Sequence, residues 1–267
     1  MKGEGNDRDL LKSGGLAGGS DIFSDRSDQF LTLGNPLIVA ARELKSPLIL
    51  MRQLSLEFTD SLENSEKSVR EDSAEIAKKI RLTSERSLRL ADSLLRAARL
   101  EDALFELEPM RIDGVIREAA DGMEPLALAL GSRISRKTPR KMPPVIANRD
   151  LLCALIANLL DNSLSQNNGG KKVEISAKIE SGFAKIFVRD HGSVISLGEF
   201  RRIRENRDQE QPISSRPNSS ALCLAVSGMF AKKMNGRLDA IRPRRGDGIA
   251  FQISLPITQQ ASLLELL

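Results

Sequence analysis

The chain has 267 residues, of which 40% are hydrophobic, so it is long enough to form one or two domains with sizeable cores. Its 40 basic and 36 acidic residues leave a formal charge of only +4, which argues against a DNA-binding surface. Aromatic residues make up 3% of the chain and include no Trp or Tyr, which also argues against single-stranded RNA binding by base stacking.

Features that would place the chain in a membrane or an oxidising compartment are missing from the sequence. No apolar stretch reaches the roughly 18 residues of a membrane span, and the amino terminus lacks the apolar core of a signal peptide. Cys153 and Cys223 match no metal-ligand or redox spacing and are expected to be small buried hydrophobic residues. The sequence therefore predicts a cytoplasmic protein.

The first ordered segment is predicted to be a long helix. Residues 1–33 contain few apolar residues and are typical of a disordered lead-in. Asn35 followed by Pro36 predicts a helix start, because proline is tolerated at the first helical position. Pro47 lies further along the same helix and predicts a kink. Residues at alternating steps of four and three are expected to share one helix face: Leu37, Ala41, Leu44, Leu48, Met51, Ser55, Phe58 and Leu62.

A second helix with the same stepping follows, so residues 34–104 are predicted to form a helical hairpin. Its stripe consists of Ile76, Ile80, Thr83, Ser87, Leu90, Leu94 and Ala97. One chain cannot fully cover the apolar seam of such a hairpin, which favours pairing with a second copy into a four-helix bundle. The alternative is a monomeric hairpin that packs on its own C-terminal domain.

Residues 105–258 are predicted to form an α/β sandwich, with helices on one face of a mixed sheet, and 259–267 a tail. The fold class is therefore α+β. The expected elements are a strand within 105–113, a helix over 115–130, a helix over 149–166, a hairpin of strands 171–179 and 183–190, a mobile loop over 194–220, a helix over 220–235 capped by Gly236, and strands over 237–241 and 248–256.

The string Ala41-Arg42-Glu43-Leu44-Lys45-Ser46-Pro47-Leu48 resembles the H-box of sensor histidine kinases, Ser-His-Glu-Leu-Arg-Thr-Pro-Leu. The resemblance implies that Arg42 stands at the phosphoacceptor position. A guanidinium stays protonated and has no lone pair to attack a phosphate, so autophosphorylation is predicted to be absent. The resemblance further places Glu43 and Ser46 where family members have the acid and the polar residue that dephosphorylate a response regulator.

A second string, Asn158-Leu159-Leu160-Asp161-Asn162-Ser163, resembles the family's N-box. Asparagines four residues apart share one helix face, so Asn158 and Asn162 are candidate ligands for Mg²⁺ held by ATP phosphates. Downstream, Ser165 and Gln166 stand where the family usually has a lysine and an aromatic residue, which predicts weaker neutralisation of phosphate.

Two further strings resemble the glycine-rich boxes of the same family. Val188–Ile195 retains Asp190, which in the family receives the adenine amino group, and Gly192, whereas Val194 replaces the second glycine. Residues 219–226 resemble Gly-x-Gly-Leu-Gly-Leu-Ala-Ile, with the glycines replaced by Ser219, Ala221 and Cys223. Those glycines let backbone N–H groups close on phosphates, so ATP and Mg²⁺ binding is expected to be weakened or lost.

The resemblance predicts a histidine-kinase ATPase domain of the GHKL class behind a dimerisation hairpin, and it leaves several functions open. The first is a pseudokinase scaffold, a homodimer or a heterodimer with an active kinase, that docks a response regulator or that kinase. The second is a phosphatase of a response regulator, and the third is an ATP-binding kinase that acts on a partner's histidine. A non-signalling GHKL ATPase is disfavoured because Asn158 stands where such enzymes have a glutamate base. His191, the only histidine, is expected to be incidental.

Overall fold

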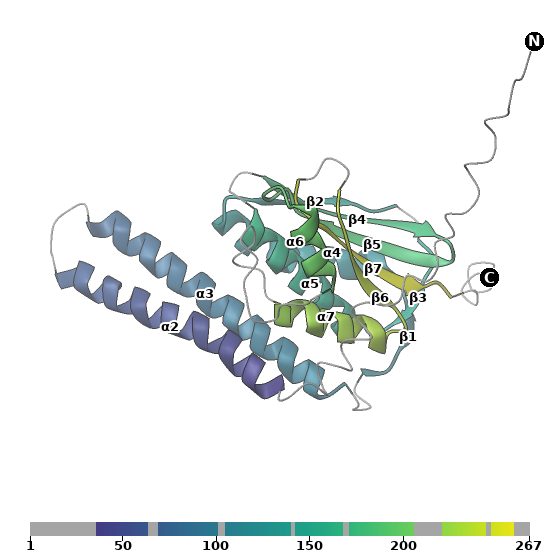
Figure 1. Ribbon diagram of the computed structural model, residues 1–267, viewed down its shortest axis with the longest axis horizontal. Coiled ribbons are helices and arrows are strands. Elements are labelled where there is room, and N and C mark those ends of the chain that lie inside the picture. Colours follow the sequence, from purple (N-terminus) through teal and green to yellow (C-terminus); the bar gives the residue numbers. More distant parts are fainter. Residues whose placement is uncertain are drawn as a thin grey trace, which may run out of the picture.

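Two long helices form a hairpin that projects from an α/β body (Figure 1). This computed structural model describes residues 36–63, 69–100, 105–139, 142–167, 171–205, 221–243 and 247–258. The first helix, α2 (Pro36–Glu63), begins at the predicted proline and runs through Pro47 as one helix, and α3 (Val69–Ala98) packs along it. The predicted lead-in, 1–33, and tail, 259–267, lie outside the described residues.

The buried face of α2 differs from the predicted stripe. Leu48 is 56% exposed and Ser55 is exposed, whereas Leu54, which the stripe omits, is only 8% exposed. Within one chain the face of α2 that packs on α3 is therefore rotated toward Leu54. The stripe of α3 is confirmed, because Ser87 and Leu90 are buried and its other members are half-buried.

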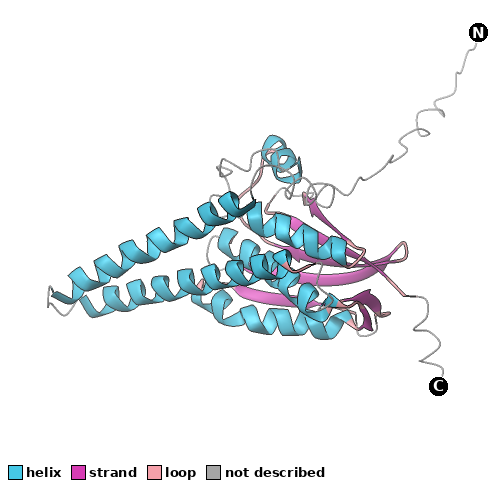
Figure 2. Cartoon of the chain, turned by 90° about the horizontal axis from the view of Figure 1, so that it is seen from below, coloured by secondary structure: helices cyan, strands magenta, loops and turns pink. Residues whose placement is uncertain are grey.

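The α/β body is a layer of helices on one face of a five-stranded sheet (Figure 2), as the sequence predicted. The helices are α4 (Ile112–Ala129), α5 (Arg149–Gln166) and α7 (Ala221–Lys233). The strand order is β2-β4-β5-β7-β6, for β2 (Arg133–Lys137), β4 (Lys172–Glu180), β5 (Phe183–Arg189), β6 (Arg237–Ile241) and β7 (Ala250–Pro256). Among the strands that the structure describes, only β2 and β4 pair in parallel, and β1 (Glu108–Met110) pairs with β3 (Val145–Ala147) in a separate antiparallel ladder.

The core lies between the helix layer and the sheet. Alternate residues of β5, Ala184, Ile186 and Val188, are fully buried, as expected of a strand with one face on the core. Central helix α5 is apolar on more than one side because it packs on the sheet, on α4 and on α7. Its fully buried side chains include Leu155 and Leu159. This central helix also carries the asparagines of the candidate site.

The segment predicted to be a loop over 194–220 contains a helix, α6 (Leu197–Glu205), and residues 206–220 lie outside the described part. The prediction is wrong for α6, because Ser196 and Glu199 form a capping box that starts this helix. The Ser196 hydroxyl accepts the backbone N–H of Glu199 at 3.1 Å, and the Glu199 carboxylate accepts the backbone N–H of Ser196 at 3.1 Å. Strands β2 and β3 were also not predicted.

The end of α7 is formed by Asn235 rather than by the predicted cap residue, Gly236. Asn235 adopts the left-handed conformation, with a φ of 53°. Gly236 is required for a different reason, because a Cβ atom there would lie 2.5 Å from the Ser254 carbonyl oxygen. The glycine therefore allows the chain that leaves α7 to cross close to β7.

Candidate functional site

A row of buried amide side chains follows one face of α5. Asn158, Asn162 and Gln166 are spaced at steps of four and are 6%, 2% and 6% exposed. Within the described part of the chain, Asn158 Nδ2 and Gln166 Nε2 have no hydrogen-bond partner. Because a buried polar atom without a partner is costly, this face suits a polar ligand such as a nucleotide phosphate with its metal.

Asp190 lies directly after β5 and its side chain is fully buried. Its Oδ1 accepts the backbone N–H of Gly192 at 3.0 Å and that of Ile249 at 3.3 Å. A Cβ atom on Gly192 would lie 2.6 Å from the Gln166 carbonyl oxygen, so only glycine lets this loop close on the end of α5. The structure thereby brings Asp190 and Gly192 next to the amide row of α5.

Gly248 is a residue of this site that the sequence predicted only as the first residue of a strand, 248–256. Its φ is +67°, and a Cβ atom there would lie 2.1 Å from the Asp190 carbonyl oxygen and 2.6 Å from Asp190 Oδ1. Gly248 therefore fixes the position of Asp190 from the side of β7. Its place two residues before a strong strand pattern was the only signal in the sequence.

His191 belongs to a charged cluster beside Asp190. Its Nδ1 lies 3.2 Å from Asp247 Oδ2, and Arg189 Nη2 lies 3.2 Å from Asp247 Oδ1. The hydrogen bond with His191 lowers the pKa of the Asp247 carboxyl. Likewise, the hydrogen bond from Lys172 lowers the pKa of the Glu174 carboxyl, which lies 3.9 Å from His191 Nε2. The cluster ties the loop after β5 to the turn before β7.

The replaced glycines create no backbone strain where the structure describes them. Val194 is 69% exposed and is not among the described residues with positive φ. Ala221 is the first residue of α7, and Cys223, in its first turn, is 9% exposed. Ser219 lies outside the described residues. Helix α7 packs on α5, the helix that carries the amide row.

The H-box-like string lies on α2, outside the amide row. Arg42 and Glu43 are helical, and their side chains are outside the described part. Ser46 is exposed.

Helix α3 of the hairpin docks directly on the amide row. The Ser93 hydroxyl donates to Asn158 Oδ1 at 3.1 Å, in a contact between residues 65 positions apart. Arg86 Nε and Arg89 Nη2 each lie 3.1 Å from a carboxylate oxygen of Asp161, whose side chain is 10% exposed. No local sequence pattern could have predicted these contacts.

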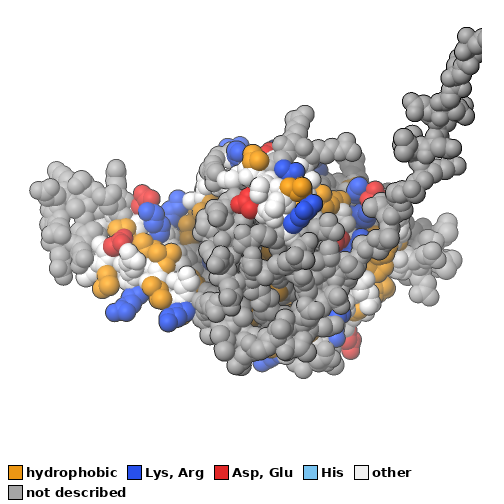
Figure 3. All heavy atoms as spheres, in the orientation of Figure 1, with side chains coloured by type: hydrophobic (Ala, Val, Ile, Leu, Met, Phe, Trp, Pro, Cys, Tyr) orange, Lys and Arg blue, Asp and Glu red, His pale blue; other side chains and the backbone are white. Residues whose placement is uncertain are grey.

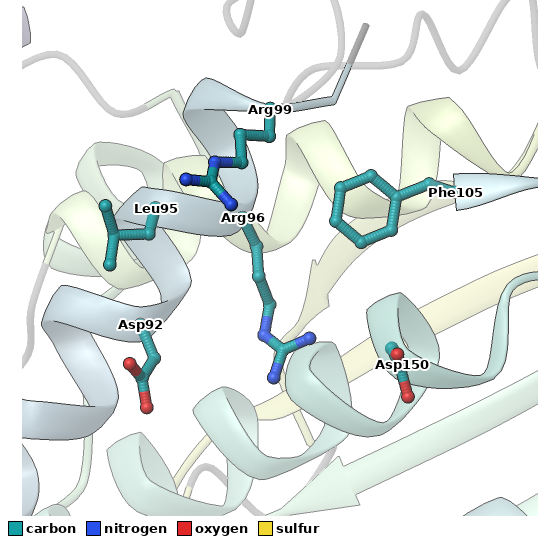
Figure 4. Close-up of a pocket in the computed structure, with 6 residues that line it drawn as sticks. All are labelled: Asp92, Leu95, Arg96, Arg99, Phe105 and Asp150. Atoms are coloured by element: carbon teal, nitrogen blue, oxygen red, sulfur yellow. The ribbon is translucent and has the colours of Figure 1, made fainter. Parts of the chain in front are cut away.

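A cavity of about 450 Å³ lies elsewhere, between the end of α3 and the start of α5 (Figure 4). It is lined by Asp92, Leu95, Arg96, Arg99, Phe105 and Asp150. None of the candidate nucleotide residues lines it, so it is not the predicted site. Among the described residues, no group of three or more His, Cys, Asp and Glu is arranged to hold a metal ion.

Comparison with known proteins agrees with this geometry. Residues 147–259 match the family described as histidine kinase-, DNA gyrase B-, and HSP90-like ATPase. Over 226 residues the chain is 27% identical to the sensor protein CutS of Streptomyces coelicolor, which covers 82% of this chain and 51% of CutS. Residues 147–259 are thus an ATPase domain of this family, and the chain as a whole is similar to sensor histidine kinases.

The chain spans about half of CutS and 31% of the histidine protein kinase DivJ of Caulobacter vibrioides. Its fold is also that of the histidine kinase AdeS of Acinetobacter baumannii, with a TM-score of 0.52 at 16% identity over 81% of this chain and 98% of AdeS. Histidine kinase ThkA, in a complex with the response regulator protein TrrA, gives a TM-score of 0.59 at 16% identity over 88% of this chain and 65% of ThkA. None of the helices in the described ranges is both long and apolar enough for a membrane span.

Proposed function

We propose that this chain is a cytoplasmic pseudokinase scaffold of a two-component system, with residues 34–104 as its dimerisation hairpin and 105–258 as its ATPase domain. The observation that carries the proposal is Arg42, which stands in the H-box-like string where the family has its phosphoacceptor. Arginine cannot accept the phosphoryl group. His191, the only histidine in the chain, is hydrogen-bonded to Asp247 in the ATPase half and cannot replace the missing acceptor on the hairpin.

The surface of the hairpin supports a docking role. Large apolar side chains are exposed on both helices, including Leu48 at 56%, Leu56 at 58%, Leu88 at 64% and Leu95 at 59%. Figure 3 shows hydrophobic side chains beside Lys and Arg on the projecting part of the hairpin. Such a surface suits a second copy of the chain or an active kinase as the partner in a four-helix bundle. The complex of ThkA with TrrA supports a response regulator as a further partner.

The ATPase domain retains part of a nucleotide site. Asn158 and Asn162 are the proposed ligands of Mg²⁺ held by ATP, and Asp190 with Gly192 the proposed adenine contacts. Asn158 Nδ2 and Gln166 Nε2, which have no hydrogen-bond partner in the described part of the chain, and the buried Asp190 fit such a ligand. Binding is expected to be weakened, because Ala221 and Cys223 add side chains where the family uses glycine to approach phosphates closely.

Incubation with ATP labelled on its γ-phosphate tests the missing acceptor. The wild-type chain is expected to form no phosphohistidine, and Arg42→His serves as the variant in which an acceptor is restored. Acid-labile phosphate on wild-type protein would overturn the proposal. Light scattering after gel filtration gives the oligomeric state, and a dimer is expected.

A response-regulator phosphatase is the second candidate, and the exposure of Ser46 on α2 favours it. Because position 42 carries no phosphoacceptor, phosphoryl transfer from the hairpin to the regulator would not compete with dephosphorylation of the regulator. The assay follows the loss of phosphate from a phosphorylated receiver domain, with Ser46→Ala as the test. Ser55→Ala is the matched control, because Ser55 is exposed on the same helix and its hydroxyl donates to the Met51 carbonyl oxygen, one turn away, at 2.8 Å. Equal rates for both variants would exclude this role for Ser46.

A further inference from the structure

The hydrogen bond between Ser93 and Asn158 lies in a dry contact between the hairpin and the ATPase domain. Ser93 is 3% exposed and Asn158 is 6% exposed, so water does not compete for the bond. The bond uses Asn158 Oδ1, the oxygen proposed above as a metal ligand. A magnesium ion keeps several waters and contacts substrate phosphates, so it needs open space around that oxygen. Helix α3 covers this space.

Two arginines reinforce the same contact. Arg86, Arg89 and Ser93 are spaced at three and four residues and therefore share one face of α3. Opposite them, Asp161 and Asn158 are three residues apart on α5. Each carboxylate oxygen of Asp161 lies 3.1 Å from one arginine, and the arginine side chains are only 35% and 29% exposed. Ion pairs shielded to this degree are screened less than surface pairs.

Apolar packing next to these polar contacts also holds α3 against the ATPase domain. Leu90, between Arg89 and Ser93 in sequence, is 8% exposed and belongs to the same buried cluster as the core of the ATPase domain. Helix α3 also packs on α7. A separation of α3 from α5 would expose these apolar side chains, so docked and open arrangements are two distinct states.

We propose that Arg86, Arg89 and Ser93 form a latch on Asp161 and Asn158 that competes with Mg-ATP, so that nucleotide binding requires the hairpin to leave α5. The proposal rests on the nucleotide role of Asn158 within the proposed function. If Mg-ATP binds only the open state, its apparent affinity falls in proportion to the fraction of molecules that are open. Weakening the latch increases that fraction and therefore tightens Mg-ATP binding.

Calorimetric titration of the full chain with Mg-ATP tests the latch. Ser93→Ala is expected to lower the dissociation constant about threefold and the double variant Arg86→Gln/Arg89→Gln about tenfold, from the lost polar contacts. Arg81→Gln is the matched control, because Arg81 is exposed on the same helix and pairs with Glu85 one turn away. It should bind as the wild type does. Unchanged or weaker binding by the latch variants would overturn the proposal.

Hydrogen exchange on the wild-type chain gives a second test that needs no variant to fold. Saturating Mg-ATP is expected to reduce protection of the backbone amides of residues 86–93, and retained protection with nucleotide bound would overturn the latch. If neither the wild type nor any folded variant binds Mg-ATP, the latch has nothing to compete with and the proposal fails. That result leaves the scaffold function standing, because the scaffold function is tested by phosphohistidine formation and by the oligomeric state.

Discussion

Replacing Gly248 by alanine should displace Asp190 and destabilise the ATPase domain. The φ of +67° alone costs an alanine about 1–2 kcal/mol. The added methyl would also lie 2.1 Å from the Asp190 carbonyl oxygen and 2.7 Å from its carbonyl carbon. Since both are backbone atoms, relief requires the turn before β7 to move, which adds about 2–3 kcal/mol. The sum, about 3–5 kcal/mol, corresponds to a melting temperature lower by roughly 10 °C.

Gly182→Ala is the matched control for this experiment. Gly182, in the turn between β4 and β5, has a φ of +78°, but no atom lies within 4 Å of the added Cβ. The control variant should therefore lose only the conformational part, about 1–2 kcal/mol. Urea unfolding of both variants measures the difference. If Gly248→Ala loses no more free energy of unfolding than Gly182→Ala, within about 0.5 kcal/mol, the close packing of Gly248 on Asp190 is refuted.

Three further predictions concern the core, acid stability and the thiols. Leu155→Ala, at a fully buried position of α5, should lower the free energy of unfolding by about 3–4 kcal/mol in urea titrations. A loss below about 1 kcal/mol would contradict the place of Leu155 in the core. The hydrogen bond with His191 lowers the pKa of Asp247, so the stabilising contribution of the Asp247 carboxylate is present above about pH 4 and is lost as the pH falls further. The melting temperature of Asp247→Asn should therefore depend less on acid pH than that of the wild type. Identical pH profiles of the two melting temperatures would speak against the pairing. Burial raises the pKa of the Cys153 thiol and Cys223 is buried, so a thiol reagent at pH 7.5 should label the folded chain far more slowly than the urea-unfolded chain, and rapid labelling of the native protein would refute this.

Elements defined by a local pattern were predictable from the sequence. The bounds of α5 follow from its apolar spacing, and its start is fixed by Asn148, whose side chain accepts the backbone N–H of Leu151 at 3.0 Å. Strands β4 and β5 follow from alternation. The spacing of Asn158 and Asn162 also places both on one helix face before any coordinates are known. In each case the information lies within a few residues of the chain.

Features that depend on distant parts of the chain were not predictable. The choice of Leu54 over Leu48 for the buried face of α2 depends on where α3 lies. The role of Gly248 depends on Asp190, which is 58 residues away in the sequence. Ser93 looks like an ordinary polar residue near the end of a helix, and only the docked arrangement shows that it meets Asn158.

Helix α7 packs on α5 on one side and on α3 on another, and all of its residues from 222 to 230 are buried. Exposing one side of such a helix to water costs free energy, so its contact with α3 stabilises the docked arrangement. Without nucleotide, when the hairpin is docked, the hairpin and the ATPase domain are therefore expected to unfold in one cooperative transition. A fragment that starts at residue 105 would leave α7 uncovered, and such a fragment would tend to aggregate. In the docked arrangement, helix α3 of the hairpin thus completes the core of the ATPase domain.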